Sequence, residues 1–316
     1  MNDSKSTPNI TTKQESIDVS SDEILDTAPL DKEVNNASDD LKKLIAMNKQ
    51  KKQSESAPQR AEINYVVRCE LGAERNRNED SCFVFSSSSG GTFPISPFGL
   101  FVVADGMGGH KNGHIASNIA SRVTAKYILD KIYKPIITNY SSTPNLPPIQ
   151  EVLEEAVKAA HAAIYDNQPE TDSGTTLTLA LILGRRLYVA HVGDSRLYFK
   201  ADDKFEVVTK DHSLVQRLKD VGQYTEAAHQ KYGSVLIRAV GQGEDIEVDT
   251  YMRLLPKNGR IMLCSDGLWG LVSDKYIEKM LEQDITIQNS VDYLYEKSME
   301  AGGHDNITAI IVDFTL

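Results

Sequence analysis

Three strongly apolar runs in this chain each end in an aspartate. L-F-V-V-A-D ends at Asp105, L-Y-V-A-H-V-G-D at Asp194 and I-M-L-C-S-D at Asp266. Short apolar runs of this composition are typical of buried strands. A carboxylate at the end of a buried strand loses water, which is costly unless a cation or a hydrogen-bond donor compensates it. Each aspartate adjoins a glycine, so the alternative is that each one only caps a turn or the following helix.

Further acids fall at comparable places. Glu79 and Asp80 precede one β-rich run, and Asp305 opens another. Several carboxylates that converge in a small space cannot all stay ionised without positive charge. The simplest source of that positive charge is one or more divalent ions with oxygen ligands, Mg²⁺ or Mn²⁺, rather than a zinc ion with nitrogen and sulfur ligands. Gly106, directly after Asp105, could add its carbonyl as a ligand.

The cysteine content and the net charge limit where the protein is expected to work and which kinds of partner it can bind. Cys69, Cys82 and Cys264 form no CxxC pair, which excludes a disulfide scaffold, predicts core packing and fits a reducing, cytoplasmic location. The 34 Lys and Arg against 45 Asp and Glu give a net charge of −11, which disfavours nucleic acid as a partner. No stretch of about eighteen apolar residues is present, so no membrane span is expected.

The amino-acid composition of the chain changes near residue 60. Residues 1–60 contain no aromatic residue and few apolar ones, so they offer too little surface to offset the entropy of ordering. We therefore expect a disordered N-terminal tail over 1–60 and one folded domain over 61–316. A basic cluster at 42–52 leaves open that the tail docks on an acidic partner or a membrane surface.

Within the domain, blocks of strands alternate with blocks of helices. Strands are predicted over 63–69, 81–85, 100–104, 175–183, 186–192, 196–200, 205–209, 246–254, 260–265 and 307–314. Helices are predicted over 112–132, 149–167, 274–281 and 287–301, with a short one from 213 and an irregular stretch over 222–234. This pattern, with hairpins and without a regular βαβ array, indicates an α+β fold.

Seven segments carry a resemblance to a known family. They read G-A-E-R-N-R-N-E-D (72–80), V-A-D-G-M-G-G-H (103–110), S-G-T-T (173–176), V-G-D-S-R (192–196), T-K-D-H-S (209–213), C-S-D-G-L-W (264–269) and G-H-D-N-I-T (303–308). In this order they resemble the metal-dependent protein serine/threonine phosphatases, also called type 2C or PPM, in a bacterial-like form. The resemblance covers roughly residues 63–316 and implies a four-layer α-β-β-α sandwich, in which helices flank two antiparallel sheets.

The resemblance also implies roles for the acids. By position, Asp105 would bridge two Mn²⁺ or Mg²⁺ ions. Asp266 and Asp305 would complete the ligands of one ion, and either Glu79 or Asp80, with the Gly106 carbonyl, would serve the other. Asp194 would help to hold a third, weaker ion. Asn306, beside Asp305, would orient that acid.

The chemistry implied is hydrolysis of phosphoserine and phosphothreonine by a metal-activated water, with Arg75 as the phosphate-binding side chain. Cysteine-based phosphatases are disfavoured because no Cys-x₅-Arg phosphate cradle is present. Many relatives have a histidine directly after the Asp-Gly pair as general acid, whereas this chain has Met107 there and His110 three residues later. Either His110 or a metal-bound water would then supply the proton.

The resemblance implies a monomeric hydrolase in signalling that counteracts serine/threonine kinases, with phosphorylated proteins as partners. The stretch 222–234 corresponds to the variable flap beside the active site, although an ordinary surface loop is a comparable reading. Two rival functions stay open: a catalytically silent phosphatase-like binding module, and a metal-dependent nuclease, which the negative charge disfavours.

Overall fold

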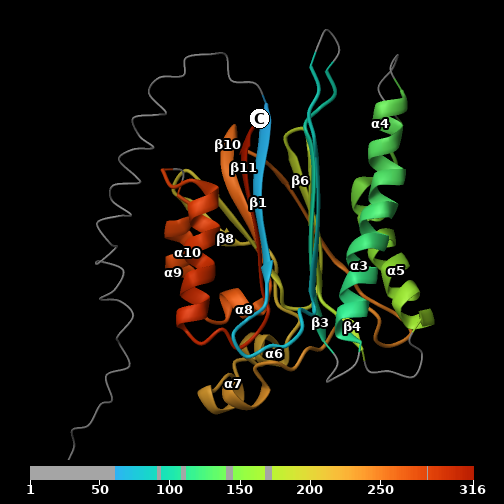
Figure 1. The fold of residues 1–316 in the computed structure, drawn as a ribbon. Coiled ribbons are helices and arrows are strands. Elements are labelled where there is room, and N and C mark those ends of the chain that lie inside the picture. The colour runs from blue at the N-terminus through green and yellow to red at the C-terminus, as the bar shows by residue number, and fades with distance from the viewer. Residues whose placement is uncertain (1–60, 91–93, 108–111, 140–144, 168–172, 283) are drawn as a thin grey trace, which may run out of the picture.

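The computed structural model describes residues 61–90, 94–107, 112–139, 145–167, 173–282 and 284–316. The tail expected over 1–60 therefore lies outside the described residues. In the described part of the chain, the secondary structure forms two antiparallel sheets with helices on their outer faces, the four-layer sandwich that the resemblance implies (Figure 1).

The first sheet joins the two ends of the domain. Its strand order is β1 (Glu62–Glu70), β11 (Ile307–Thr315), β10 (Asn258–Cys264), β7 (Arg196–Ala201) and β8 (Lys204–Val207). β1 pairs along its whole length with β11. Closure of this sheet therefore depends on strands that are far apart in the chain.

The second sheet is built largely of neighbours in sequence. Its order is β2 (Asp80–Ser87), β3 (Phe98–Met107), β5 (Leu177–Leu183), β6 (Arg186–Val192) and β9 (Asp249–Leu254). The two-residue strand β4 (Gly174–Thr175) pairs with the end of β3. The hairpin between β5 and β6 turns at Gly184, whose φ of 57° favours glycine.

Helices cover the outer face of each sheet (Figure 1). α3 (Gly113–Ile128), the π-helical turn η2 (Leu129–Tyr133), α4 (Lys134–Thr138) and α5 (Ile149–Asn167) lie on the second sheet. α8 (Asp266–Trp269), α9 (Asp274–Met280) and α10 (Ile287–Glu300) lie on the first sheet. α6 (Leu214–Asp220) and α7 (Glu226–Tyr232) form a lobe at one end.

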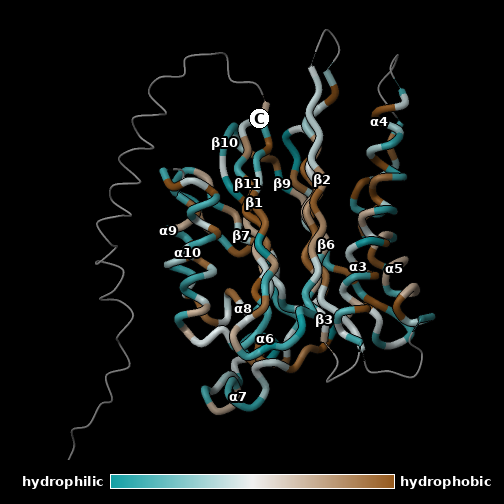
Figure 2. Tube along the Cα trace, in the orientation of Figure 1, coloured by the Kyte–Doolittle hydropathy of each residue, from teal (hydrophilic) through white to brown (hydrophobic). Residues whose placement is uncertain are grey.

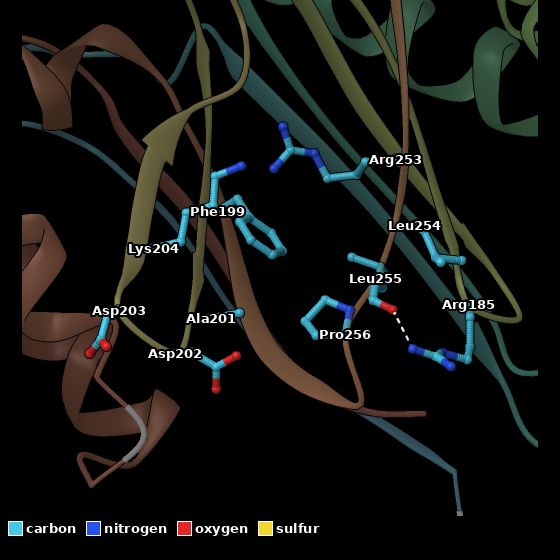
Figure 3. A pocket seen from close by; sticks show the side chains of 10 residues that line it. All are labelled: Arg185, Phe199, Ala201, Asp202, Asp203, Lys204, Arg253, Leu254, Leu255 and Pro256. Carbon is cyan, nitrogen blue, oxygen red and sulfur yellow. Dashed lines mark hydrogen bonds between the residues drawn. The ribbon is translucent and has the colours of Figure 1, made fainter.

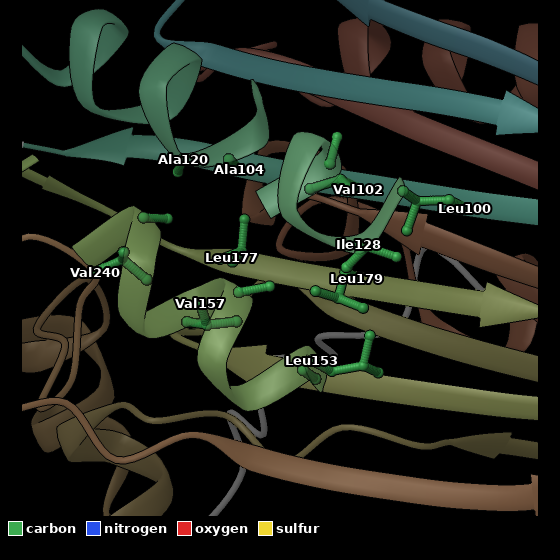
Figure 4. Close-up of a cluster of buried hydrophobic side chains, with 14 of the residues drawn as sticks. Leu100, Val102, Ala104, Ala120, Ile128, Leu153, Val157, Leu177, Leu179 and Val240 are labelled. Atoms are coloured by element: carbon green, nitrogen blue, oxygen red, sulfur yellow. The ribbon is translucent and has the colours of Figure 1, made fainter. Parts of the chain in front are cut away.

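Three buried clusters fill the three spaces between the four layers, because side chains alternate along each strand. On β3, Leu100 and Val102 point toward α3 and α5 (Figure 4), whereas Phe101 and Val103 point between the sheets. On β10, Ile261 and Leu263 also lie between the sheets, and Met262 and Cys264 face the helices of the other side. Figure 2 shows the hydrophobic residues concentrated along these strands. Burial on both faces explains why the strands read as continuous apolar runs.

One cavity, of about 830 Å³, opens between the edge strands β8 and β9 (Figure 3). Phe199, Leu255 and Pro256 line it together with charged side chains that include Arg185 and Arg253. The Arg185 Nη2 atom donates a hydrogen bond of 3.0 Å to the Leu255 carbonyl. These residues lie at the ends of their strands away from Asp105, so this cavity is separate from the strand ends that carry the acids.

Some predicted elements need correction. The stretch 222–234, predicted to be irregular, contains α7, which is capped by the Thr225 hydroxyl accepting from the Ala228 N–H at 3.1 Å. None of the α7 side chains is buried, so the sequence shows no apolar periodicity there. The first long helix continues through η2 and α4 to Thr138 rather than ending near 132. β9 begins at Asp249 rather than at 246. In the described ranges, no helix combines the length and apolar character needed to span a bilayer.

Candidate metal centre

The predicted acids lie at one end of the sandwich, and both sheets contribute. Asp105 is near the end of β3, and Asp194 follows β6 in the same sheet. Asp266 is the first residue of α8 and is separated from β10 by Ser265, and Asp305 comes shortly before β11; both of these strands belong to the other sheet. The centre therefore forms only when the two sheets are stacked.

Asp105 lies among four other aspartates. Burial raises the pKa of its carboxyl well above the ordinary value, and the negative charges of Asp80, Asp266, Asp194 and Asp305 raise that pKa further. Its backbone is fixed, because its N–H donates to the Thr176 hydroxyl at 2.9 Å. The charges of the four other aspartates thus all act against ionisation of this carboxyl.

The pKa values of the neighbouring acids are raised for the same reasons. Burial is the main cause that raises the pKa of Asp266, and Asp305 is the next, while a hydrogen bond with the Asp105 side chain acts in the opposite direction. Burial and then the charge of Asp266 raise the pKa of Asp194. Without a cation, these carboxyls are held in their neutral form more strongly than exposed acids would be.

The residues fit a divalent ion with oxygen ligands. Among the described residues, the Asp266 Oδ1 atom is buried and has no hydrogen-bond partner, which is costly for a carboxylate oxygen. The nearby atoms that could bind an ion are carboxylate and carbonyl oxygens, the type of ligand that Mg²⁺ and Mn²⁺ prefer. Within the same residues, no three Asp, Glu, His or Cys side chains are already arranged as the ligands of one ion. Binding would therefore have to draw these carboxylates closer together.

Gly106 lets two backbone segments approach each other beside Asp105. Its N–H donates to the Glu79 carbonyl at 3.1 Å. A Cβ at this position would collide with the Gly113 and Glu79 carbonyl oxygens. Any larger residue would push Glu79 away from Asp105, so glycine is required here.

Asp80 and Glu79, which the sequence left as alternatives, have different surroundings. Asp80 lies opposite Asp105 in the β2–β3 ladder, and its pKa is raised by burial. One of its oxygens, Oδ2, accepts hydrogen bonds from the Thr308 hydroxyl at 2.6 Å and the Ser265 hydroxyl at 2.8 Å. No side-chain hydrogen bond of this kind holds the Glu79 carboxylate in the described residues, and its side chain is half-buried. Asp80 thus ties β2 to β10 and β11.

Arg75 pairs with an acid of the centre. Its Nη2 atom lies 2.6 Å from Asp305 Oδ2, and its Nε atom donates to the His304 carbonyl at 3.2 Å. Burial acts to lower the pKa of Arg75, but Asp305, Glu79 and Asp105 outweigh it and raise the pKa. The side chain is 44% exposed, so the guanidinium lies at the border between the acids and the solvent.

Asn306 connects the two loops that carry these residues. Its backbone N–H donates to Asp305 Oδ1 at 2.7 Å, as expected for a residue that orients this acid. Its side chain accepts from the Glu79 N–H at 2.9 Å and donates to the Arg77 carbonyl at 3.1 Å. One buried amide therefore fixes Asp305 and Glu79 relative to each other.

Asp194 rests on a buried platform that the sequence did not predict. The Trp269 indole donates to the Asp194 carbonyl at 2.9 Å. The Arg196 guanidinium stacks on the Trp269 ring at 3.5 Å and binds both oxygens of Asp211, at 3.0 and 2.7 Å. The only sequence signal for this platform is that its members fall in the quoted segments 192–196, 209–213 and 264–269.

The structure does not test every predicted residue. His110, the predicted proton donor, lies outside the described residues. Ser265 and Thr308, which bind Asp80, were missed as individual residues, although both lie within quoted segments. The remaining predicted residues, Glu79 and Arg75 among them, lie with the acids at one end of the sandwich.

Comparison with known proteins gives a consistent result. The family model of protein phosphatase 2C matches residues 73–302. The chain is 31% identical over 251 residues to a serine/threonine phosphatase stp of Listeria innocua, which covers 79% of this chain and 95% of that protein.

Two solved structures share the fold. The serine/threonine phosphatase PstP of Mycobacterium tuberculosis superposes with a TM-score of 0.64 at 32% identity, over 80% of this chain and 99% of that one. The PstP catalytic domain in complex with two manganese ions gives a TM-score of 0.64 at 31% identity, over 81% of this chain and 100% of that one.

Proposed function

This chain belongs to the protein phosphatase 2C family, and on that premise we propose that it is a metal-dependent phosphatase acting on phosphoserine and phosphothreonine in proteins. The observation that supports this most directly is the convergence of aspartates from both sheets around Asp105, with Arg75 at their border. A related catalytic domain binds two manganese ions, and the oxygen-only donor set here suits Mn²⁺ or Mg²⁺.

We assign the ion-holding residues as follows. Asp105 would serve both ions, and Asp266 and Asp305 would complete the ligands of one of them. The Gly106 carbonyl and Glu79 would serve the other, because one oxygen of Asp80 already accepts hydrogen bonds from two hydroxyl groups. Asp194 would help to hold a third ion.

When bound, such a pair of ions supplies a water that is deprotonated near neutral pH and offsets charge on the phosphoryl group. Arg75 then leaves Asp305 and grips two phosphoryl oxygens, since its planar fork matches them and keeps its charge. The half-exposed position of its side chain leaves room for this movement. His110 or a water donates the proton that the departing serine or threonine oxygen needs.

The test is hydrolysis of a phosphothreonine peptide with Mn²⁺, with EDTA, and by Asp105→Asn and Asp266→Asn variants. We expect EDTA to abolish turnover and each variant to lose about 100-fold or more. Asp203→Asn, which makes the same change in charge at an exposed turn far from the acids, is the matched control. Wild-type turnover by both site variants would refute the assignment, and phosphopeptide binding without turnover by the wild type would favour a silent binding module.

We further propose the finer features that the family suggests. The enzyme acts as a cytoplasmic monomer in signalling and opposes serine/threonine kinases, with residues 61–316 as the catalytic domain and 1–60 as a tail. Light scattering of the purified chain would test the monomer, since a mass twice that of one chain would contradict it.

A further inference from the structure

Two of the three cysteines lie on neighbouring edge strands, one in each sheet. Cys69 belongs to β1, an edge strand of the first sheet, and Cys82 to β2, an edge strand of the second. The interaction with the Cys82 side chain is the first cause that lowers the pKa of the Cys69 thiol, to about 6. Both side chains are half-buried, whereas Cys264 is fully buried. Core packing, predicted for all three, describes Cys264 and in part Cys82, which packs against the cluster between the sheets, but it does not explain why two thiols lie on facing edge strands.

The strand geometry accounts for the contact. On β1, Cys69 shares a face with Tyr65, whose ring packs edge-on against Phe101 in the cluster between the sheets, with 5.9 Å between ring centroids. On β2, Cys82 packs against the same cluster. Both sulfur atoms therefore point into the space between the sheets from opposite sides. Two thiols presented by rigid strands meet more reproducibly than thiols on loops.

The segment between the two cysteines carries part of the candidate centre. Residues 70–81 hold Arg75, Glu79 and Asp80. Around the sulfur of Cys69, the Asn78 amide lies at 3.5 Å and the Thr308 hydroxyl at 3.2 Å. The pair is thus located at the two ends of this segment.

We propose that Cys69 and Cys82 form a reversible disulfide on exposure to peroxide and so close residues 69–82 into a covalent ring. This inference does not rest on the proposed function, because the reaction needs neither a metal ion nor a phosphorylated substrate. The ring links the two sheets at their shared edge.

The chemistry balances with hydrogen peroxide as the oxidant. The sulfur of one thiolate attacks a peroxide oxygen, the O–O bond breaks, and a sulfenic acid and hydroxide form. The second sulfur then attacks the sulfenic sulfur, the S–O bond breaks, and the hydroxide that leaves takes up the thiol proton as water. The hydroxide from the first step takes up the proton that was released when the thiolate formed. In all, the two cysteines lose two electrons and two protons, and one peroxide is reduced to two waters.

The test treats the full chain with hydrogen peroxide in EDTA and measures the intact mass and the peptide map. We expect a mass loss equal to two hydrogen atoms, a cross-linked peptide that contains Cys69 and Cys82, and complete reversal by dithiothreitol. The count of titratable thiols in denaturant should fall from three to one. The melting temperature should rise on oxidation and fall again on reduction, because the ring restricts the unfolded chain.

Matched variants separate this pair from general oxidation. Cys82→Ser should abolish the cross-link and leave a sulfenic acid on Cys69 that dimedone traps. Cys264→Ala should form the cross-link as the wild type does. An unchanged mass for the wild type, or cross-links that include Cys264, would overturn the proposal. So would an irreversible gain of oxygen on Cys69 at equal rates in the wild type and Cys82→Ser. These outcomes are independent of phosphatase activity.

Discussion

Replacing Arg196 by methionine should destabilise the fold strongly, even though this residue is not among the ion-holding acids. Arg196 binds Asp211 through two hydrogen bonds and stacks on Trp269. Its side chain is only 16% exposed and that of Asp211 only 9%. The variant would keep the apolar bulk of the side chain but leave Asp211 as a buried charge without its partner.

The expected magnitude follows from that burial. Removing one partner of a buried ion pair costs about 3–5 kcal/mol of unfolding free energy. For a domain of this size, each kcal/mol lowers the melting temperature by roughly 2–4 °C, so a decrease of roughly 6–20 °C is expected. Arg196→Lys should recover only part of the loss, because lysine keeps the charge without the planar fork.

A double-mutant cycle measured by urea unfolding in EDTA at neutral pH is the appropriate assay. Asp211→Asn in the Arg196→Met background removes the unpaired charge and should restore about 2 kcal/mol or more. A change below about 1 kcal/mol for Arg196→Met, or additive effects of the two substitutions, would show that the pair is not the buried anchor described above.

Three further predictions follow from other parts of the structure. Burial lowers the pKa of His191 to about 3 against an ordinary value of 6.5. Neutral His191 should therefore contribute on the order of 5 kcal/mol to the free energy of unfolding above pH 6.5, and this contribution should be lost as the pH falls toward 3. The midpoint of urea unfolding should depend less steeply on pH for His191→Gln than for the wild type, and parallel curves for the two proteins would contradict this. The raised pKa of Asp105 means that the metal-free protein loses stability as the pH rises above the ordinary aspartate value of 3.8. At neutral pH in EDTA, Asp105→Asn should therefore melt higher than the wild type. Mn²⁺ at one hundred times Kd should stabilise the wild type by about 2.7 kcal/mol and so reverse the order. A lower melting temperature for the variant in EDTA would count against the acid cluster. Gly267→Ala should cost about 1–3 kcal/mol, since its Cβ would collide with the Asn306 carbonyl, whereas Gly90→Ala, with open space around it, should be neutral in the same thermal melts.

The sequence predicted the layers better than it predicted the connections between them. Continuous apolar runs such as 100–104 predicted strands buried on both faces, and the structure confirms them. Periodicity carries no information about which strands pair, so the closure of β1 onto β11 was not predictable from the pattern. α7 was missed because a helix that buries no side chain shows no apolar period.

The same limit applies to the candidate centre. The strand-end position of the acids favoured a shared site for Asp105 and Asp266, because burial of a carboxylate demands compensation, but it left open that each acid only caps a turn or a helix. Sequence could not separate Glu79 from its neighbour Asp80, since the difference comes from hydroxyls on Ser265 and Thr308, which only the fold brings to Asp80. Trp269 entered the sequence analysis only as the end of the segment 264–269, and the fold alone shows that its indole N–H supports Asp194.

The division of the acids between two sheets has a consequence for how such a protein can diverge. Asp105 and Asp194 are held by one sheet, and Asp266 and Asp305 by the other. The spacing between the two pairs is therefore set by the side chains that pack between the sheets, here called the seam, such as Phe101 and Leu263. A hybrid that took each sheet from a different relative would inherit every acid and still misplace them unless the seam were exchanged as well. Substitutions at the seam should therefore be accepted in compensating pairs, even though none of those residues is among the acids themselves.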